Sequence, residues 1–475
     1  MRSPSTSACR LAAAGSGCRS CARRRIARTI AGLALLLVLA ACTPTAAYRT
    51  HLAPAGGECR VQAEHSCAGE VLYEVVPPAA AAADADTPTS VHLGFVEFDD
   101  QGYLLEPALK DELMRRIEAM AEQRPLLVVV YAHGWKHNAA DGDSDIAAFQ
   151  QLLLRVAAAD HAVCARSACA RRHVVGVYLG WRGLSATLEP FKELSFWGRK
   201  SRAHRVGTDG ATEVLAELAK IKSSTNALPG RSGSDETRLV LTGHSFGGAL
   251  LYSATEQLLV RDSAFPVRGT IRRNVADLVV LVNPAFEAAR FHALQRKAGQ
   301  LAFDRTQRPI LAVFTSRTDT ATRIAFPLGR GLATLLQRYS SPEQRTQNVT
   351  ALGHYAPYQT HELVLQQPSK RASGEPIALV GLAAALCGWQ DFQSGRSDAW
   401  ALGDLTFARL PRMRVDGQRQ NPYMVVSVDD GIIAGHNGIW GERFSEFLYR
   451  FVAVQSARPG RACRAPADDA PDADG

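Results

Sequence analysis

Residues 238–248, Arg-Leu-Val-Leu-Thr-Gly-His-Ser-Phe-Gly-Gly, decide the fold of this chain. Leu239 to Thr242 are apolar or β-favouring, and a short run of this kind closed by glycine predicts a buried parallel strand. After the glycines, apolar residues recur at helical spacing: Ala249, Leu250, Leu251, Ala254, Leu258 and Leu259. The stretch therefore predicts a strand, a tight turn and a helix in succession.

The turn itself reads Gly243-His244-Ser245-Phe246-Gly247, a G-x-S-x-G motif. A serine on such a strand-to-helix turn adopts strained backbone angles, and side chains in place of the two glycines would collide with the neighbouring strand and helix. The hydroxyl of Ser245 is expected above the sheet, at the positive end of the helix. A chance match is the alternative for so short a motif, but the flanking strand and helix favour Ser245 as a nucleophile.

The composition describes a large folded body with a basic leader. The chain has 475 residues, 46% of them hydrophobic, which is enough for a sizeable core. The formal charge of +8 suggests a nucleic-acid partner, but residues 1–41 carry seven arginines and no acid, so the remainder has a charge of only +1. The nearly neutral body gives no support to a nucleic-acid partner.

Residues 1–41 have the pattern of a targeting segment. Arginines 23–25 and 28 precede an apolar stretch from Ile30 to Ala41, which is too short to span a membrane as a helix. The stretch ends in Leu39-Ala40-Ala41-Cys42, which resembles a bacterial lipobox with Cys42 as the lipidated residue. Because Thr43 and not aspartate follows, the resemblance implies an outer-membrane anchor facing the periplasm. An ordinary secretory signal is the alternative.

The remaining cysteines fit an oxidising compartment. Six lie beyond Cys42, and an even number in an exported protein predicts three disulfides. Close spacing favours Cys59–Cys67 and Cys164–Cys169, which leaves Cys387–Cys463, although six cysteines allow fifteen pairings. The close pairs lack the spacing and histidine partners of a zinc site, so we expect no metal.

Strands and helices alternate along the rest of the body. Apolar runs predict strands over 71–77, 91–98, 126–132, 174–181, 276–282, 309–315 and 423–428. Helical periodicity covers 107–123, 147–157, 211–222 and 444–451. This alternation predicts the α/β class, with a mostly parallel central sheet flanked by helices. Residues 182–207, rich in aromatic and basic side chains, are interpreted as a cap, an interfacial patch or a packed connecting helix.

Candidate partners for Ser245 follow later strands. Asp319 stands just after the strand over 309–315, and His436 lies in a glycine-flanked loop after the strand over 423–428. Glu287, after the preceding strand, is the alternative acid. Two further histidines compete with His436, and two acids are too near it in sequence to serve: His354, His361, Asp429 and Asp430.

The order serine, acid, histidine is that of the α/β-hydrolases, and the chain resembles a serine α/β-hydrolase of the esterase or lipase kind. The resemblance covers roughly 91–452 and rests on VVVYAHGWKHNA, LTGHSFGG, VNPAF, TSRTD and GHNGIW. It implies that the loop after 126–132 builds an oxyanion hole, with backbone amides at Gly134 or Trp135 acting together with that of Phe246. For His133 we expect a structural, hydrogen-bonded role.

The expected organisation has six parts. They are a lipoprotein signal peptide (1–41), a tether and linker (42–90), an α/β-hydrolase core (91–319), an insertion or cap region (320–420), a C-terminal part of the core (421–455) and a disordered tail (456–475). The insertion lies between acid and histidine, is too long for a plain loop and is expected to shape the pocket.

The resemblance implies hydrolysis of carboxylic esters, including lipid esters, through an acyl-enzyme on Ser245 with His436 and Asp319 and no cofactor or metal. The expected partners are a small or lipophilic ester and, through the lipid anchor, a membrane. Two alternatives remain open: an amidase or thioesterase with the same triad, and a non-catalytic envelope lipoprotein that uses the fold as a binding module.

Overall fold

The structure is a computed structural model of the whole chain, and it describes residues 46–77, 90–167, 170–183, 191–231, 235–366, 381–414, 420–457 and 463. The expected signal peptide, Cys42 and the tail beyond 463 lie outside the described residues. Within the described ranges, no helix is both long and apolar enough to cross a membrane.

The described strands form one sheet of twelve, in the order β1-β2-β3-β5-β4-β6-β7-β8-β12-β9-β11-β10. Pairing is parallel from β3 through to β9, and antiparallel between β2 and β3 and in the β9-β11-β10 edge. The strands are β1 (Arg60–Gln62), β2 (Leu72–Val76), β3 (Val91–Phe98), β4 (Leu126–Ala132), β5 (His173–Trp181), β6 (Arg238–His244), β7 (Leu278–Val282), β8 (Leu311–Ser316), β9 (His361–Leu365), β10 (Ala399–Leu402), β11 (Leu405–Arg409) and β12 (Tyr423–Val428).

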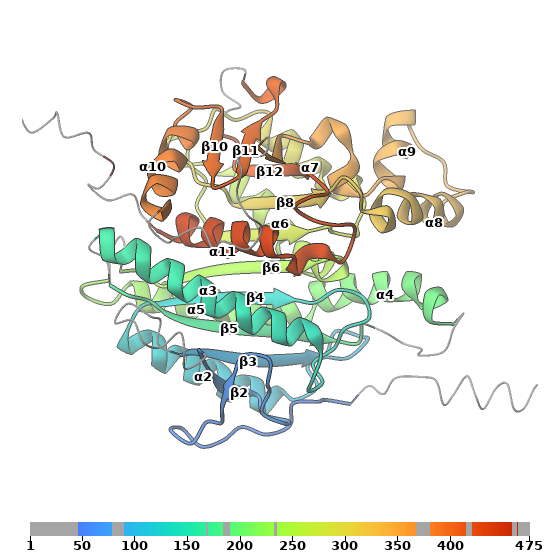
Figure 1. Cartoon of the computed structure of the whole chain (residues 1–475). Helices are drawn as coiled ribbons and strands as arrows, with labels where there is room; N and C mark the ends of the chain where they lie inside the picture. The colour runs from blue at the N-terminus through green and yellow to red at the C-terminus, as the bar shows by residue number, and fades with distance from the viewer. Residues whose placement is uncertain are drawn as a thin grey trace, which may run out of the picture.

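Helices cover both faces of this sheet, so the α/β class with a mostly parallel, flanked sheet is confirmed (Figure 1). One face carries α2 (Pro107–Gln123), α4 (Phe191–Thr208), α5 (Gly210–Asn226), α6 (Phe246–Ala264) and α7 (Ala288–Ala298). The other face carries α3 (Ser144–Ser167), α10 (Gly381–Gln393) and α11 (Glu442–Ser456). The helices α8 (Phe326–Ala333) and α9 (Pro342–Val349) follow the short π-helical turn η2 (Ala321–Ala325).

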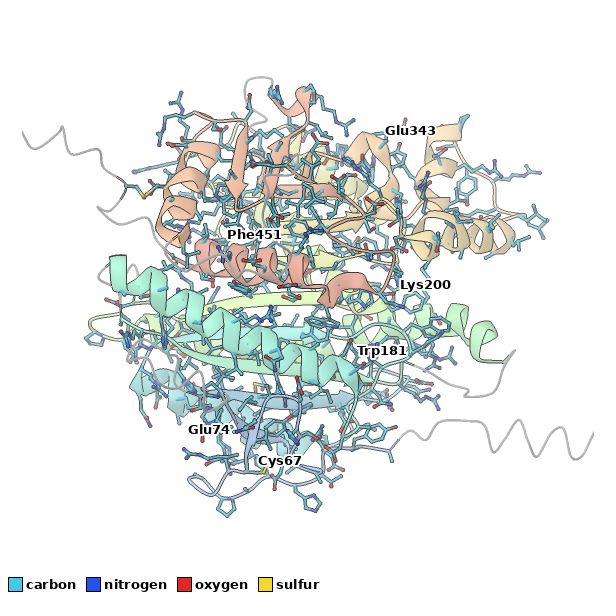
Figure 2. All side chains as sticks on the ribbon, in the orientation of Figure 1. Cys67, Glu74, Trp181, Lys200, Glu343 and Phe451 are labelled. Atoms are coloured by element: carbon cyan, nitrogen blue, oxygen red, sulfur yellow. A yellow bond between two sulfur atoms is a disulfide. The ribbon has the colours of Figure 1, made fainter. Side chains whose placement is uncertain are left out.

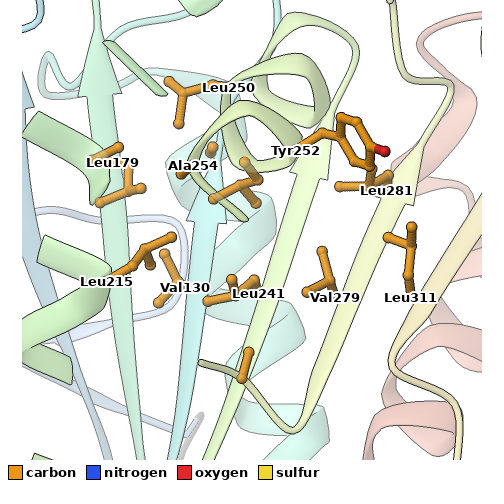
Figure 3. Close-up of a cluster of buried hydrophobic side chains, with 14 of the residues drawn as sticks. Val130, Leu179, Leu215, Leu241, Leu250, Tyr252, Ala254, Val279, Leu281 and Leu311 are labelled. Carbon is orange, nitrogen blue, oxygen red and sulfur yellow. The ribbon is translucent and has the colours of Figure 1, made fainter. Parts of the chain in front are cut away.

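Alternating side chains of the strands fill two separate cores. In β4, Val128 and Val130 belong to the core under α5 and α6, whereas Leu127, Val129 and Tyr131 belong to the core under α3 and α11. The continuous apolar runs read from the sequence follow from this, because a parallel strand with helices on both faces buries every residue. Figure 3 shows part of the first core, where Leu250 of α6 lies on the side of Leu179 and Tyr252 of the same helix lies beside Leu281.

The range 42–90 is more than a tether in its described part. β1 and β2 form one edge of the sheet, and the disulfide Cys59–Cys67 lies beside them. Arg49, which the sequence places in the expected tether, is buried, and its guanidinium donates to the carbonyl of Ala139 and pairs with Asp141. These contacts could not be predicted from the sequence, because an isolated arginine ordinarily stays in solvent.

The range 320–420 extends the sheet as well as adding helices. β9 pairs in parallel with β12, and β11 and β10 continue the same sheet beyond it. The pairing Cys387–Cys463, which remained after the closely spaced pairs were assigned, is present and joins α10 to the tail. Cys164 is disulfide-bonded, but its expected partner Cys169 lies outside the described residues.

Candidate active site

The site lies at the carboxyl ends of the central strands. The chain passes from β3 across to β4, returns to β5 between them, and then crosses to β6 on the far side of β4. Such reversals in strand order open a crevice at the carboxyl edge of a parallel sheet, where α/β proteins bind ligands. The loops that follow β4, β6, β8 and β12 carry the residues singled out in the sequence.

Ser245 stands alone between β6 and α6 in a left-handed conformation, with φ 54° and ψ −117°. The turn that holds Ser245 in this conformation is closely packed on both sides. A Cβ at Gly247 would come within 2.0 Å of the Ala132 carbonyl oxygen, and one at Gly243 within 2.8 Å of the Gly247 carbonyl oxygen. The two glycines of the motif therefore allow the turn to press against β4 and the first turn of α6.

The side chains of Ser245, His436 and Asp319 form one hydrogen-bonded chain. His436 Nε2 lies 2.8 Å from Ser245 Oγ, and His436 Nδ1 lies 2.8 Å from Asp319 Oδ2. A carboxylate only accepts, so Nδ1 carries the proton and Nε2 accepts from the serine hydroxyl. Asp319 is fully buried, Ser245 nearly so, and the His436 side chain is only slightly exposed. The arrangement can take a proton from Ser245 as it attacks a substrate.

Asp319 is held as a carboxylate by its neighbours. Burial alone would raise its pKa, but the hydrogen bond and charge of His436 and the donors of Thr322 lower the pKa below its ordinary value. Thr322 contributes both its backbone N–H, at 3.1 Å from Oδ1, and its hydroxyl, which donates to Oδ2. The Thr322 oxygen in turn lies 2.9 Å from His354 Nε2. The rival histidine His354 therefore contacts Thr322, which supports the acid. The histidine that contacts Ser245 is His436.

Two buried side chains hold the loop of His436 by its backbone. His244 Nε2 lies 2.9 Å from the His436 carbonyl oxygen, and Asn283 Nδ2 donates to the same oxygen at 2.8 Å and to that of Gly435 at 3.2 Å. Asn283 Oδ1 also accepts from the backbone N–H of Ser316 at 2.9 Å. Burial lowers the pKa of His244 to about 3, so it stays neutral. These contacts tie the ends of β6, β7 and β8 to the histidine loop.

The loop after β4 lies directly against the serine. A Cβ at Gly134 would approach the Cβ of Ser245 to 3.2 Å and His244 Nδ1 to 2.8 Å. His133 is fully buried: its Nδ1 donates to the Gly134 carbonyl, and its Nε2 accepts from the Trp181 N–H at 3.1 Å. Burial lowers its pKa to about 4. His133 therefore supports the Gly134 backbone from behind.

A polar network joins this loop to the loop of His436. His137 Nδ1 lies 2.9 Å from Asp143, and its Nε2 lies 3.6 Å from Asp145. Asp145 also accepts from Tyr131 and from Trp440 Nε1, each at 2.8 Å. Burial by itself would lower the pKa of His137, but the hydrogen bond to Asp143 and the charge of Asp145 raise it above its ordinary value. Trp440 is four residues beyond His436, so the network fixes the two loops relative to each other.

The other rivals lie in separate surroundings. Glu287 pairs with Lys200 and, at 2.7 Å, with Arg330, whereas the carboxylate that meets His436 is that of Asp319. His361 is buried at the start of β9, stacked on Phe407, with its Nδ1 on Thr360. The structure thus brings together Ser245, His436 and Asp319, and leaves Glu287 and His361 apart from them.

A second serine–histidine contact lies deeper in α6. His204 Nδ1 is 2.8 Å from Ser253 Oγ, but the same nitrogen is 2.8 Å from Arg290 Nη1, and Ser253 donates to the Ala249 carbonyl. A histidine facing an arginine is a poor base, and burial with the nearby cations lowers its pKa well below the ordinary value. Among the described residues, no three His, Cys, Asp or Glu side chains gather as a metal site requires.

Comparison with known proteins adds little to this geometry. No family model matches the sequence, and no curated protein matches it. A solved structure that it resembles in part is Trichoderma reesei cutinase in complex with a C11Y4 phosphonate inhibitor. The identity is 15%, the match covers 38% of this chain and 70% of that chain, and the TM-score is 0.16. A TM-score this low carries no inference about function.

Sequence reasoning missed three members of the site. Asn283, Thr322 and His244 each bond to the serine–histidine–acid group or to its loop. Asn283 had a detectable signal, because it directly follows an apolar strand, as Ser245 does. Its φ of 46° also belongs to the left-handed region, which asparagine tolerates better than most residues.

Proposed function

We propose that this protein is a serine hydrolase of the α/β-hydrolase fold that cleaves carboxylic esters. The observation that carries the proposal is the chain of two 2.8 Å hydrogen bonds from Ser245 through His436 to Asp319. It is supported by the left-handed backbone of Ser245 between β6 and α6, which is the conformation that a nucleophile elbow requires.

In the proposed reaction, Ser245 Oγ attacks the ester carbonyl as His436 Nε2 takes its proton. Backbone N–H groups at Phe246 and at Gly134 or Trp135 hold the negative oxygen, and each such donor contributes about 3–4 kcal/mol to lowering the barrier. His436 returns the proton to the departing alcohol and leaves an acyl-serine. Water then attacks the acyl carbonyl as His436 takes its proton, and His436 gives that proton to Ser245 Oγ as the acyl–oxygen bond breaks and the acid leaves.

Asp319 has a supporting part in this scheme. As a buried carboxylate it keeps the Nδ1 proton of His436 in place and stabilises the imidazolium that forms during attack. The lowered pKa of Asp319 keeps it ionised through the neutral and mildly acidic range.

Residues 1–41 and Cys42 extend the proposal to location. We infer from the lipobox-like Leu39-Ala40-Ala41-Cys42 that the mature protein is lipid-anchored in a bacterial envelope, at the outer membrane facing the periplasm. Such an anchor suits a lipophilic ester as substrate.

Labelling with a fluorophosphonate probe tests the proposal, because the probe reacts only with an activated serine. Wild type should be labelled, Ser245→Ala should not, and Ser253→Ala should be labelled like wild type. Ser253 is the matched control, since it also touches a histidine but lacks the acid and the turn. A folded wild type that fails to react would favour the non-catalytic binding module. A panel of esters, thioesters and amides would then separate the remaining alternatives by rate.

A further inference from the structure

A helical segment beside the site carries its apolar side chains outward. The segment 321–336 comprises η2, α8 and the turn that follows, and we call its outer side chains the α8 face. They are exposed by 53% (Ile324), 66% (Leu328), 77% (Leu332), 74% (Leu335) and 96% (Leu336). Among the described residues nine large hydrophobic side chains are exposed, and these are five of them.

The outward direction is set by anchors on the opposite side. Thr322 and Phe326 are buried, and Arg330 pairs with Glu287 at 2.7 Å and donates to the Asn348 carbonyl. These three residues recur at a spacing of four, and Ile324, Leu328 and Leu332 recur at the same spacing two positions away. Since residues four apart share a side of a helix, the segment is amphipathic with its apolar side in solvent.

The α8 face adjoins the proposed catalytic group. Thr322 donates to Asp319, and Ile324 is only two residues further along the chain. Lys200 of α4 lies 5.5 Å above the ring of Phe326 and pairs with Glu287, so α8 is held to α4 as well (Figure 2). Figure 1 shows α8 and α9 standing out from the body beyond the end of the sheet. The α8 face is therefore joined through Thr322 to the segment that carries Asp319.

The charge around the face selects its partner. Residues 321–350 contain four arginines and a single acid, Glu343, a net charge of +3, while the body beyond residue 41 has +1 in all. Arg323, Arg338 and Arg345 are exposed. Outward leucines flanked by arginines fit the boundary of a bilayer with anionic headgroups, where the apolar side chains enter the acyl region and the cations meet phosphate.

We propose that the α8 face docks the protein on an anionic lipid surface, with the carboxyl edge of the sheet turned toward the bilayer. The anchors at Thr322, Phe326 and Arg330 keep the segment in place, so docking needs no movement of α8. The proposal concerns orientation on the membrane and does not rest on Ser245 being reactive.

Tryptophan fluorescence in the full-length chain tests the docking. Leu335→Trp places a reporter on the α8 face, and Phe265→Trp is the matched control, because both parent side chains are 74% exposed. Phe265 follows α6, a helix about 28 Å long. This helix begins at the end of the sheet that carries the site and runs toward the opposite end. The signal of the unsubstituted chain is subtracted, which removes the native tryptophans and any contribution of the leader or anchor.

On vesicles of phosphatidylglycerol and brominated phosphatidylcholine in equal parts, Leu335→Trp should shift to the blue and be quenched, and Phe265→Trp should not. Equal quenching of the two, or none of either, would overturn the proposal. A blue-shifted Leu335→Trp without vesicles would also overturn it, since a second copy or another part of this chain would then cover the face.

Partitioning of further variants into vesicles measures separately what the apolar side chains and the cations contribute to binding. Leu328→Ser with Leu332→Ser should weaken vesicle binding at least tenfold, whereas Phe265→Ser should leave it unchanged. Arg338→Gln should reduce binding to the anionic vesicles about fivefold and leave binding to pure phosphatidylcholine unaffected. Ser245→Ala should dock like wild type, so failure of docking and failure of the proposed hydrolysis are read separately.

Discussion

At the scale of residues, the proposed site is a group of three side chains held by several others. Ser245, His436 and Asp319 were found from the sequence because their order and their positions after strands are informative. Asn283 and Thr322 could not be found in this way, because their roles depend on their hydrogen bonds. Asn283 donates to the carbonyls of the His436 loop, and Thr322 donates to the carboxylate of Asp319. Both contacts join segments more than 100 residues apart or depend on the exact turn after a strand, which no local pattern encodes.

Asn283→Asp tests the grip on the histidine loop. The substitution keeps an oxygen for the Ser316 N–H but replaces the donor to Gly435 and His436 by a negative oxygen facing two carbonyls. His436 should move from Ser245, and the rate of fluorophosphonate labelling should fall by roughly 10- to 100-fold. A labelling rate equal to that of wild type would show that Asn283 does not position His436.

Thr322→Val tests the support of the acid while keeping the side-chain shape. The hydroxyl of Thr322 lowers the pKa of Asp319, so its loss should raise that pKa. The carboxylate would then be protonated at a less acidic pH, and the acid limb of the labelling-rate profile should move to higher pH. An unchanged acid limb would contradict the role given to Thr322.

At the scale of elements, strongly periodic segments could be located from the sequence and edge segments could not. The residues expected for α2, β4 and β12 are those observed, because each is a long helical pattern or a mostly apolar run. The segment 182–207, whose composition allows a cap, a surface patch or a helix, contains all but the last residue of α4, which packs on α6 through Ala203 and Val206. β9, β10 and β11 went unrecognised, because they are short and become strands by extending the edge that β12 provides.

Gly247→Ala tests how closely α6 approaches β4. The added methyl would meet the Ala132 carbonyl oxygen at 2.0 Å and that of His133 at 2.5 Å, and backbone cannot move aside cheaply. The free energy of unfolding should fall by about 3 kcal/mol or more. Gly248→Ala is the matched control in the same turn of helix: its nearest contact is 3.1 Å, so its effect should stay within about 1 kcal/mol. Chemical denaturation of the two variants measures the difference.

At the scale of the whole molecule, a long disulfide and a set of buried histidines both affect the stability of the fold. The disulfide from Cys387 to Cys463 spans 76 residues and fastens the chain after α11 to α10. The buried neutral histidines are placed between sheet and helices, with pKa values lowered by burial to about 3 for His173, His244 and His361. Each makes the stability of the fold depend on conditions in solution.

Removing the long disulfide should destabilise the fold. Cys387→Ser together with Cys463→Ser restores freedom to a 76-residue loop in the unfolded chain, and the free energy of unfolding should fall by about 2–4 kcal/mol. Denaturant titration of the variant beside the oxidised wild type measures it. Equal midpoints would mean that the tail is held by α11 alone.

Acidification should weaken the fold through its buried histidines. His361 has a pKa of about 3 when folded, because burial and then Arg409 oppose its charged form, against about 6.5 when unfolded. Below pH 6.5 the unfolded chain binds a proton that the folded one refuses, so stability falls as pH falls. Between pH 7 and 5 the loss is about 2 kcal/mol for this residue. In His361→Phe, the difference between the unfolding free energies measured at pH 7 and at pH 5 should be smaller by this amount. A difference equal to that of wild type would contradict the role given to His361.

The sequence by itself determined most of the central strands and helices and the chemical identities of the candidate site residues. Apolar runs closed by glycine specify buried strands, helical spacing specifies the covering helices, and the chain order of Ser245, Asp319 and His436 specifies the candidate group. Only the tertiary structure decided that Asp319 and not Glu287 meets His436, since both follow a strand and the choice depends on which strand lies next to β12. It also decided that α8 turns its leucines outward, because Thr322 and Arg330 are held by Asp319 and Glu287, which follow the strands β8 and β7. A sequence pattern reports on interactions within a few residues, whereas the candidate site forms where the ends of strands distant in the sequence lie together.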